Sequence, residues 1–484
     1  MPALMIQGCT SDAGKSTLVA ALCHLLHRQG YSVAPFKPQN MALSAAVTED
    51  GGEIGRAQAT QALASGLKPH TDMNPVLLKP TSDRKAQVII QGKAIGHLDA
   101  LDYHAYKTTA KAAVLESWQR LTHQYPICLV EGAGSPAEIN LRDNDIANMG
   151  FAEAVDIPVI LIADIDKGGV FAHIIGTLAC LSESEQARIK GFVINRFRGD
   201  IALLQSGLDW LEAKTGKPVL AVLPYLMDLK LDEEDAVRQT QSTSNDNQLK
   251  VRVLRLPHIS NHSDFSPLLT DPRIDFAYTA LNKHNLQADV IIIPGSKAVM
   301  SDLAQLIEQG WRDKLIKHLR YGGKILAICG GFQMLGRNLL DPKLIEGNKR
   351  QMAGLAFFDI TTRWQSDKYL VKQTGKLWTG ESISGYEMHQ GISIGNALER
   401  PFSRLDNGKT DGAISEYGNI IGTYLHGLFD HPEAYQALTQ WMGLTPDDAC
   451  PTQSHEQQQL AELDRLADML ELHMDMKKML EWIT

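Results

Sequence analysis

A cysteine stands where an apolar stretch meets two glycines. Residues 324–336 read KILAICGGFQMLG, which predicts a strand, a tight turn that carries Cys329, and a helix. Such a turn raises a nucleophile above a sheet and directs a helix N-terminus towards it, so it favours a thiolate. The backbone N–H of Gly330, together with that of Gly295 at the end of another predicted strand, would stabilise an oxyanion. We predict that Cys329 is a catalytic nucleophile.

A nucleophilic cysteine needs a base, and a histidine follows a predicted strand further along the chain. His426 lies in the run GTYLHG, where its imidazole would take the thiol proton. His431, with Glu433 two residues later, is a competing candidate. His389, in the run GYEMHQG, is expected to be structural, because a lone histidine more often is.

A second site is indicated near the start of the chain. Residues 8–17 read GCTSDAGKST and lie between a predicted strand and a predicted helix, where backbone N–H groups bind phosphate. Gly14 would allow a close approach, and Lys15 would contact the β- and γ-phosphates. Ser16 would ligate Mg²⁺, with Thr17 beside it in the phosphate site. Five residues rather than the usual four separate the two glycines, so we predict a variant P-loop that binds ATP and Mg²⁺.

Polar residues end two further predicted strands. Lys37 lies in FKPQN and Glu131 in EGAGS, at the carboxyl edge of a parallel sheet, where ligands bind. We expect Lys37 to contact the nucleotide and Glu131 to ligate Mg²⁺ through oxygen. Asp145, slightly further on, is predicted to face a second substrate. For Asp143 and Asp145 alike, a solvated loop charge is the alternative.

These residues require parallel sheets to position them. In the first part of the chain, β-branched runs alternate with amphipathic stretches, which predicts a parallel sheet covered on both faces. Its strands are expected at 3–7, 32–36, 127–130, 159–163, 191–195 and 219–223, and its helices at 16–27, 103–121 and 201–215. A second series has strands at 251–256, 290–294 and 324–329, a helix at 299–320, and later strands near 354–363 and 419–424. The segment 459–483 has apolar residues at helical spacing and is expected to dock on the body of the protein.

Composition excludes several classes of function. Lys and Arg total 47 against 56 Asp and Glu, giving a net charge of -9, which argues against a general nucleic-acid binder. The apolar runs are too short to cross a membrane. The six cysteines form no CxxC pair, so neither a zinc site nor a disulfide framework is expected. We see no targeting segment and expect a cytoplasmic protein.

Taken together, the motifs resemble the cobyric acid synthases, the glutamine-hydrolysing enzymes of cobalamin biosynthesis. The N-terminal motif with Lys37 and Glu131 resembles dethiobiotin-synthetase-like ATPases, and the turn with Cys329 and His426 resembles class I glutamine amidotransferases. Further stretches similar to the family are KPQNMAL, DYHAYK, DIANMG, VINRFRG and GTYLHGLF. The resemblance covers residues 3–443 or nearly so.

The resemblance implies a ligase with two Rossmann-like α/β domains. An N-terminal P-loop domain would occupy 1–232, a linker 233–250, a flavodoxin-like amidotransferase domain 251–443, and a tail helix 444–484. Its substrates would be ATP, L-glutamine and a corrinoid polycarboxylate, with amidation of the b, d, e and g carboxylates of adenosylcobyrinic acid a,c-diamide. Neither nucleic acid nor a membrane is expected as a partner, and a homo-oligomer is compatible with the family.

Two departures and three alternatives accompany this interpretation. Ala327 replaces the first glycine of the usual Gly-x-Cys-x-Gly turn, and Leu428 stands where class I enzymes place a Glu after the histidine. The cobyric acid branch also lacks that acid, so His426 is retained. The alternatives are cobyrinic acid a,c-diamide synthase, cytidine triphosphate synthetase, and a partner-binding ATPase switch with a degenerate second domain.

Overall fold

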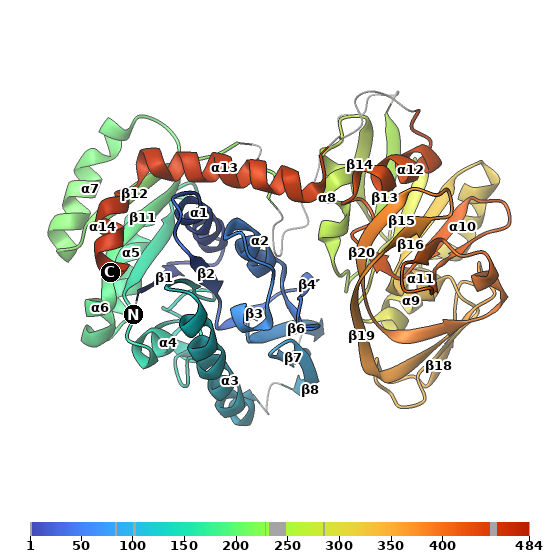
Figure 1. Cartoon of the computed structure of the whole chain (residues 1–484), viewed down its shortest axis with the longest axis horizontal. Coiled ribbons are helices and arrows are strands. Elements are labelled where there is room, and N and C mark those ends of the chain that lie inside the picture. Colours follow the sequence, from blue (N-terminus) through green and yellow to red (C-terminus); the bar gives the residue numbers. More distant parts are fainter. Residues whose placement is uncertain are drawn as a thin grey trace. The chain divides into compact units, whose positions relative to one another are not determined.

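The computed structural model describes residues 2–82, 85–99, 103–227, 229–231, 248–283, 286–445 and 453–483. The chain divides into two compact units, shown with their elements in Figure 1. The first comprises Met1–Glu234 and Gln459–Thr484, and the second Asp235–Gln458. Most of the linker predicted at 233–250 lies outside the described residues.

The first unit is built on a six-stranded sheet in the order β12-β11-β10-β1-β9-β2, with all neighbours parallel. Its strands are β1 (Ala3–Gly8), β2 (Val33–Phe36), β9 (Ile127–Glu131), β10 (Val159–Asp164), β11 (Ile189–Phe197) and β12 (Val219–Pro224). β1, β9 and β10 are buried along their whole length, as expected for strands covered on both faces. The predicted α/β class is confirmed.

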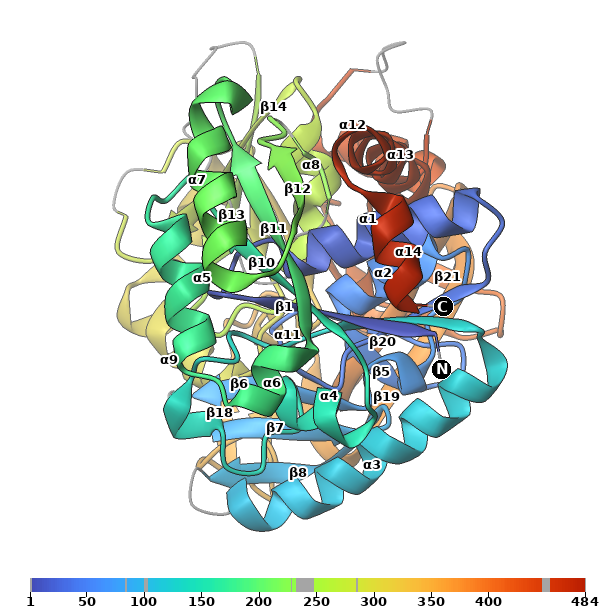
Figure 2. The ribbon, with the colours of Figure 1, turned by 90° about the vertical axis from the view of Figure 1, so that its left-hand side faces the viewer.

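Helices cover both faces of this sheet. One face packs against α1 (Lys15–Arg28), α13 (His455–His473) and α14 (Met476–Ile483), which Figure 2 shows on the same side. The other packs against α3 (Tyr103–Gln124), α4 (Met149–Ala154), α5 (Val170–Ala179) and α7 (Ile201–Thr215). α6 (Glu183–Arg188) leads into β11. The apolar side chains between the sheet and the helices on each face form two buried clusters. They hold the sheet in place, and the candidate phosphate site lies at its carboxyl edge.

A smaller sheet of the first unit was not predicted. β3 (Gln39–Met41) pairs with β6 (Val76–Ser82), and β7 (Lys85–Ile90) and β8 (Lys93–Asp99) extend it in antiparallel order. β4 (Ala45–Val47) and β5 (Glu53–Gly55) form a separate pair that leads into α2 (Arg56–Ala64).

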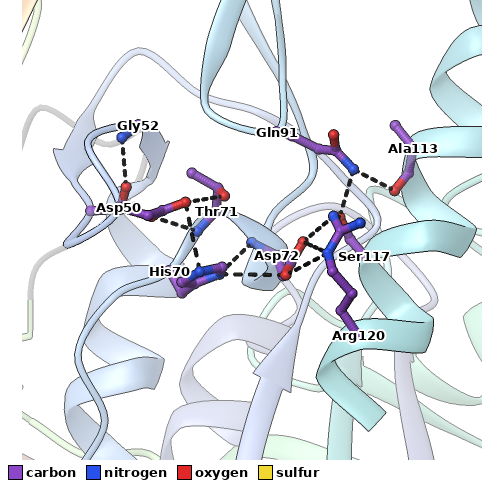
Figure 3. A network of polar contacts seen from close by, with 10 residues as sticks. Asp50, Gly52, His70, Thr71, Asp72, Gln91, Ala113, Ser117 and Arg120 are labelled. Atoms are coloured by element: carbon purple, nitrogen blue, oxygen red, sulfur yellow. Dashed lines mark hydrogen bonds and ion pairs between the residues drawn. The ribbon is translucent and has the colours of Figure 1, made fainter. Parts of the chain in front are cut away.

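A polar network joins the short helix η1 (Thr71–Met73) to α3 (Figure 3). The Asp72 carboxylate accepts hydrogen bonds from two nitrogens of Arg120, from Nε at 3.0 Å to Oδ2 and 3.1 Å to Oδ1, and from Nη2 at 2.6 Å to Oδ1. On its other side, the Asp72 backbone N–H donates to Nδ1 of His70. Thr71 donates to Asp50 at 2.5 Å. Because Lys37 N–H donates to the carbonyl of Met73, this network holds the end of η1 that supports Lys37.

The second unit has a six-stranded sheet in the order β14-β13-β15-β16-β24-β23. β13 (Leu249–Arg255), β14 (Ile274–Ala280), β15 (Val290–Ile293), β16 (Lys324–Ile328) and β24 (Ile420–Thr423) are parallel, and β23 (Ala413–Ile414) is an antiparallel edge. Around it lie α8 (Ser266–Thr270), α9 (Val299–Glu308), α10 (Trp311–Arg320), α11 (Gly330–Met334) and α12 (Pro432–Met442).

A second, seven-stranded sheet was also missed. Its path runs β18-β17-β19-β20-β25, with β21 on β19 and β22 on β21. The strands are β17 (Asn338–Leu340), β18 (Gln351–Ala353), β19 (Thr361–Leu377), β20 (Ser382–Ile394), β21 (Ser403–Leu405), β22 (Thr410–Asp411) and β25 (Leu425–His426). The strand predicted near 354–363 therefore begins only at Thr361.

Two predicted helices are wrong in their continuity. Gly310, with φ of 68°, separates α9 from α10 and lets Trp311 turn into the core. In the tail, Met474 forms a bridge with Ala221, and Asp475 N–H donates to the carbonyl of Leu220. Pairing with the edge strand β12 thus ends α13 before α14 begins.

Candidate active sites

Cys329 lies in the turn between β16 and α11. Its backbone has φ of 52° and ψ of −110°, a conformation that side chains rarely adopt and that signals strain at a functional turn. The turn is held because Cys329 N–H donates to the carbonyl of Thr423 at 2.8 Å. A Cβ atom on Gly331 would lie 2.1 Å from the carbonyl oxygen of Ile293. This position therefore requires glycine, whereas Ala327 fits, fully buried, within β16.

His426 is held by Asp264 of the short helix η3 (His262–Phe265). The imidazole Nδ1 lies 2.6 Å from Oδ2 of Asp264, and Gly427 N–H donates to the other carboxylate oxygen at 3.2 Å. The ring also stacks on Tyr386, with 5.2 Å between centroids and 17° between planes. Asp264 thus fixes the orientation of the ring and leaves Nε2 for Cys329.

The electrostatics of this group favour a thiolate and an imidazolium. Burial alone would raise the pKa of Cys329, but the charge of His426 and a hydrogen bond with it lower that pKa below its ordinary value. Burial would lower the pKa of His426, but Asp264 and Cys329 raise it to about 10. Each partner therefore stabilises the charged form of its neighbour. A thiolate held in this way is a nucleophile at neutral pH.

The glycines predicted to supply oxyanion donors lie beside this group. A Cβ atom on Gly295 would approach Cε1 of His426 to 3.4 Å, and one on Gly330 would lie 2.9 Å from the backbone nitrogen of Ser296. Both backbones are thus packed closely around Cys329 and His426. Their role as oxyanion donors stays a prediction.

Asp264 is the residue that the sequence analysis missed. It is 4% exposed and lies in a run of buried polar residues that follows β13, next to β15 in the sheet. A polar run after a central parallel strand was the available signal. The competing residues lie elsewhere: His431 precedes α12, and exposed Glu433 in its first turn accepts a hydrogen bond from Ser382 N–H.

The loop of residues 8–14 leads from β1 into α1. Gly14 has φ of 99° and precedes the helix, and a Cβ atom on it would lie 2.1 Å from Nδ2 of Asn195. Lys15 is 7% exposed, and its Nζ donates to the carbonyl of Thr10 at 3.3 Å. Burial lowers the pKa of Lys15, and Glu131 opposes this shift. Thr17 is half-buried in the first turn.

Glu131 lies at the centre of the first site. Its Oε1 accepts hydrogen bonds from Ser16 Oγ at 2.6 Å and from Lys37 Nζ at 2.9 Å. Its Oε2 accepts from Gln61 at 2.6 Å and from Gln58 at 3.3 Å. Burial alone would raise its pKa, but the charge of Lys37 and these hydrogen bonds lower it. The structure thus brings three predicted residues together and adds two glutamines of α2 that the sequence analysis missed.

The residues of this site fit a magnesium ion. Ser16 Oγ and Glu131 Oε1 already lie within 2.6 Å of each other, and hydroxyl and carboxylate oxygens are the ligands that Mg²⁺ prefers. Within the described ranges no group of three or more His, Cys, Asp and Glu gathers as a metal cluster. The remaining ligands would therefore come from phosphates and water, as is usual for Mg²⁺.

Asp145 has a structural partner. Its carboxylate accepts hydrogen bonds from the backbone N–H groups of Ala147, Asn148 and Gly150 at 2.8 to 3.0 Å, so it caps the N-terminus of α4. Asp143 accepts a hydrogen bond from Lys107 through its backbone carbonyl. Asp145 thus shapes the loop after β9, and its contact with a substrate stays a prediction.

Two family models match the chain along most of its length. Residues 4–237 match the CobQ/CobB/MinD/ParA nucleotide binding domain, and residues 250–434 match the CobB/CobQ-like glutamine amidotransferase domain. The chain has a cobyric acid synthase-type architecture. The first unit therefore carries a P-loop nucleotide-binding domain, and the chain is a glutamine-hydrolysing amidotransferase of the ligase class.

Solved structures show weaker likenesses. PurLQS from Thermotoga maritima is 16% identical, with 46% of this chain and 97% of that chain covered and a TM-score of 0.29. A glutamine amidotransferase is 15% identical over 40% and 99%, with a TM-score of 0.31. Chloroplast FtsY from Physcomitrella patens is 16% identical over 46% and 57%, with a TM-score of 0.27. Scores this low support no conclusion about function.

None of the helices in the described part of the chain combines the length and apolar composition that a membrane crossing requires.

Proposed function

We propose that this chain uses ATP and L-glutamine to amidate the b, d, e and g carboxylates of adenosylcobyrinic acid a,c-diamide, which gives adenosylcobyric acid. The observation that supports it most is that one chain carries both the Cys329–His426–Asp264 group and the phosphate site around Glu131. A partner-binding switch with a degenerate second domain would have no need of an oriented cysteine and histidine.

In the second unit the residues divide the hydrolysis of glutamine between them. The Cys329 thiolate attacks the carboxamide carbon, and the N–H groups of Gly295 and Gly330 receive the negative charge on its oxygen. His426, oriented by Asp264, gives its proton to the leaving ammonia and then takes one from the water that hydrolyses the thioester.

In the first unit the residues bind and orient a nucleotide. Mg·ATP, when bound, would supply the phosphoryl group that turns a carboxylate into an acyl phosphate. Ammonia would then attack the acyl carbon and displace phosphate, which gives the amide. Lys15 and the N–H groups of the loop would bind its phosphates. Ser16 and Glu131 would hold Mg²⁺, and Lys37 keeps Glu131 ionised.

Mass spectrometry of the corrinoid product tests the proposal. The full chain is incubated with Mg·ATP, glutamine and adenosylcobyrinic acid a,c-diamide, beside Cys329→Ala and the matched control Cys180→Ala, which removes an exposed free thiol. We expect multiple amidation by the wild type and the control, and amidation by Cys329→Ala only when ammonia is supplied. If a folded, ATP-binding protein amidates the diamide from neither nitrogen source, the proposal is wrong. Amidation of cobyrinic acid instead would identify the a,c-diamide synthase reaction.

A further inference from the structure

The charge of a second histidine acts on the nucleophile Cys329. His389 of β20 was expected to be structural, yet both of its ring nitrogens are engaged. Nδ1 lies 2.8 Å from the carbonyl oxygen of Gly391, and Nε2 lies 3.0 Å from Oε2 of Glu387. The side chains of His389 and Glu387 are 9% and 10% exposed, so water competes little for these bonds.

Both atoms that face the ring are acceptors. A carbonyl oxygen can only accept, and an ionised carboxylate can only accept. The other oxygen of Glu387 accepts a hydrogen bond from Gln373 Nε2 at 2.8 Å, so both carboxylate oxygens serve as acceptors. A ring between two acceptors must carry a proton on each nitrogen. Donation from both ring nitrogens corresponds to the imidazolium form of His389.

Two short backbone segments connect His389 with Cys329, one through Met388 and one through Tyr424 and Thr423. The carbonyl oxygen of Met388, the preceding residue, lies 3.5 Å from Sγ of Cys329. On one face, His389 stacks on Tyr424, with 3.9 Å between centroids and 25° between planes. Tyr424 directly follows Thr423, whose carbonyl accepts the N–H of Cys329. The cation and the thiol are thus held by the same short segments of backbone.

We propose that His389 is a positioning residue, a fixed imidazolium that keeps Cys329 in its thiolate form and takes no part in proton transfer. The inference rests on the proposed function, in which Cys329 attacks glutamine. His426 must lose its charge whenever it gives a proton to ammonia. His389 keeps its charge through the cycle because both of its N–H groups are used by Glu387 and Gly391.

The pKa of Cys329 agrees with this role. Burial raises that pKa, the charge of His426 and its hydrogen bond lower it, and the charges of His389 and Lys297 lower it further. His426 alone is therefore not the whole source of the thiolate.

Other charged groups also surround the ring. Glu387 on the same strand is negative, and burial raises the pKa of Asp411 to about 6, with Glu387 raising it and His389 lowering it. Tyr369 of β19 packs at 5.5 Å from the ring of His389, and Lys409 lies 5.5 Å from the centroid of that tyrosine. Because Glu387 by itself would oppose a thiolate, a higher midpoint after its removal would come from the lost charge of the His389 ring and not from the lost carboxylate.

The test is the pH dependence of the alkylation of Cys329 by iodoacetamide in the full chain, followed by mass spectrometry. In His389→Gln we expect the rate at pH 7 to fall about tenfold and the midpoint to rise by about one pH unit, with rates converging at high pH. In Glu387→Gln the ring no longer needs its second proton, so the midpoint should also rise. Ser393→Ala, which removes the hydroxyl that forms a hydrogen bond with the hydroxyl of Tyr424, is the matched control and should leave the profile unchanged.

Kinetics and folding complete the test. In His389→Gln, the kcat of glutamine-dependent turnover should fall with little change in the KM for glutamine. Ammonia-dependent amidation by this variant should stay at the wild-type rate. His389→Phe keeps the stacking and replaces His389→Gln if that variant fails to fold in a thermal melt. An unchanged profile in a folded His389 variant, or a lower midpoint in Glu387→Gln, overturns the inference and leaves the proposed function standing. An ordinary thiol profile for Cys329 in the wild type would also overturn the inference, whereas the proposed function fails only if the amidation assay gives no product.

Discussion

Asp264→Asn should abolish most glutamine-dependent activity without unfolding the second unit. In the wild type, Asp264 accepts from both Nδ1 of His426 and the N–H of Gly427. An asparagine can keep its oxygen on Gly427, but its NH₂ group would then face Nδ1. The ring proton would have to move to Nε2, the nitrogen left for Cys329, and His426 could no longer accept the thiol proton.

The size of the effect follows from the charges. Nδ1 and Oδ2 lie 2.6 Å apart in a fully buried pair, and Asp264 helps to raise the pKa of His426 to about 10. Unit charges centred about 4 Å apart interact by about 4 kcal/mol at an effective dielectric constant of about 20. A loss of that size corresponds to about a 1,000-fold lower kcat/KM for glutamine.

Glutamate release from glutamine is the assay, with ammonia-dependent amidation measured in parallel. Glu433→Gln is the matched control, because it removes the exposed carboxylate of the competing pair His431 and Glu433, in which the acid follows the histidine by two residues. We expect full activity in this control, and unimpaired ammonia-dependent amidation in both variants. Less than a tenfold loss in a folded Asp264→Asn, or a large loss in Glu433→Gln, would refute the assignment of Asp264 as the group that orients His426.

Three further outcomes are expected in the first unit. Glu131→Gln leaves buried Lys37 without its negative partner, so calorimetry should show at least tenfold weaker binding of Mg·ATP. Glutamate release in the presence of glutamine alone should stay intact. An unchanged affinity for Mg·ATP would contradict the role of Glu131 in holding the metal. Asp72→Ala removes the bidentate contact with half-exposed Arg120 and should lower the free energy of unfolding by about 1–2 kcal/mol in urea denaturation, and an unchanged midpoint would contradict this. Burial alone would raise the pKa of Asp50, but hydrogen bonds from Thr71 and Thr48 lower it. The contribution of Asp50 to stability is therefore present above pH of about 4 and lost as the pH falls further. The melting temperature of Asp50→Asn should lie below that of the wild type at pH 7, and the two melting temperatures should converge at low pH.

The parallel strands and their helices could be predicted because the signal is local. The run that became β1 is apolar except for Gln7 and ends at the glycine of the loop, and the helix predicted at 201–215 has the bounds of α7. The long antiparallel pair β19 and β20 was missed because its faces mix polar and apolar residues. Such strands gain stability from cross-strand contacts that periodicity does not show.

The same limit applies to the sites. Cys329 and the loop before Lys15 carry their chemistry in consecutive residues, so the motif and its position after a strand were enough. Asp264 lies 162 residues before His426 in the sequence, and only the order of strands in the sheet brings the two together. His389 could be judged only when the acceptors on both ring nitrogens were known.

The last helices of the chain have a consequence for synthesis on the ribosome. Leu463, Leu466 and Leu470 of α13 are buried in the same cluster as α1 and β1, although the whole second unit is translated between them. Because chains fold as they emerge, the first unit cannot close its core until the second has been made. A nascent chain would therefore expose, for most of its translation, the part of this apolar cluster that α13 and α14 cover, and a stop codon before 459 would harm the nucleotide-binding unit first.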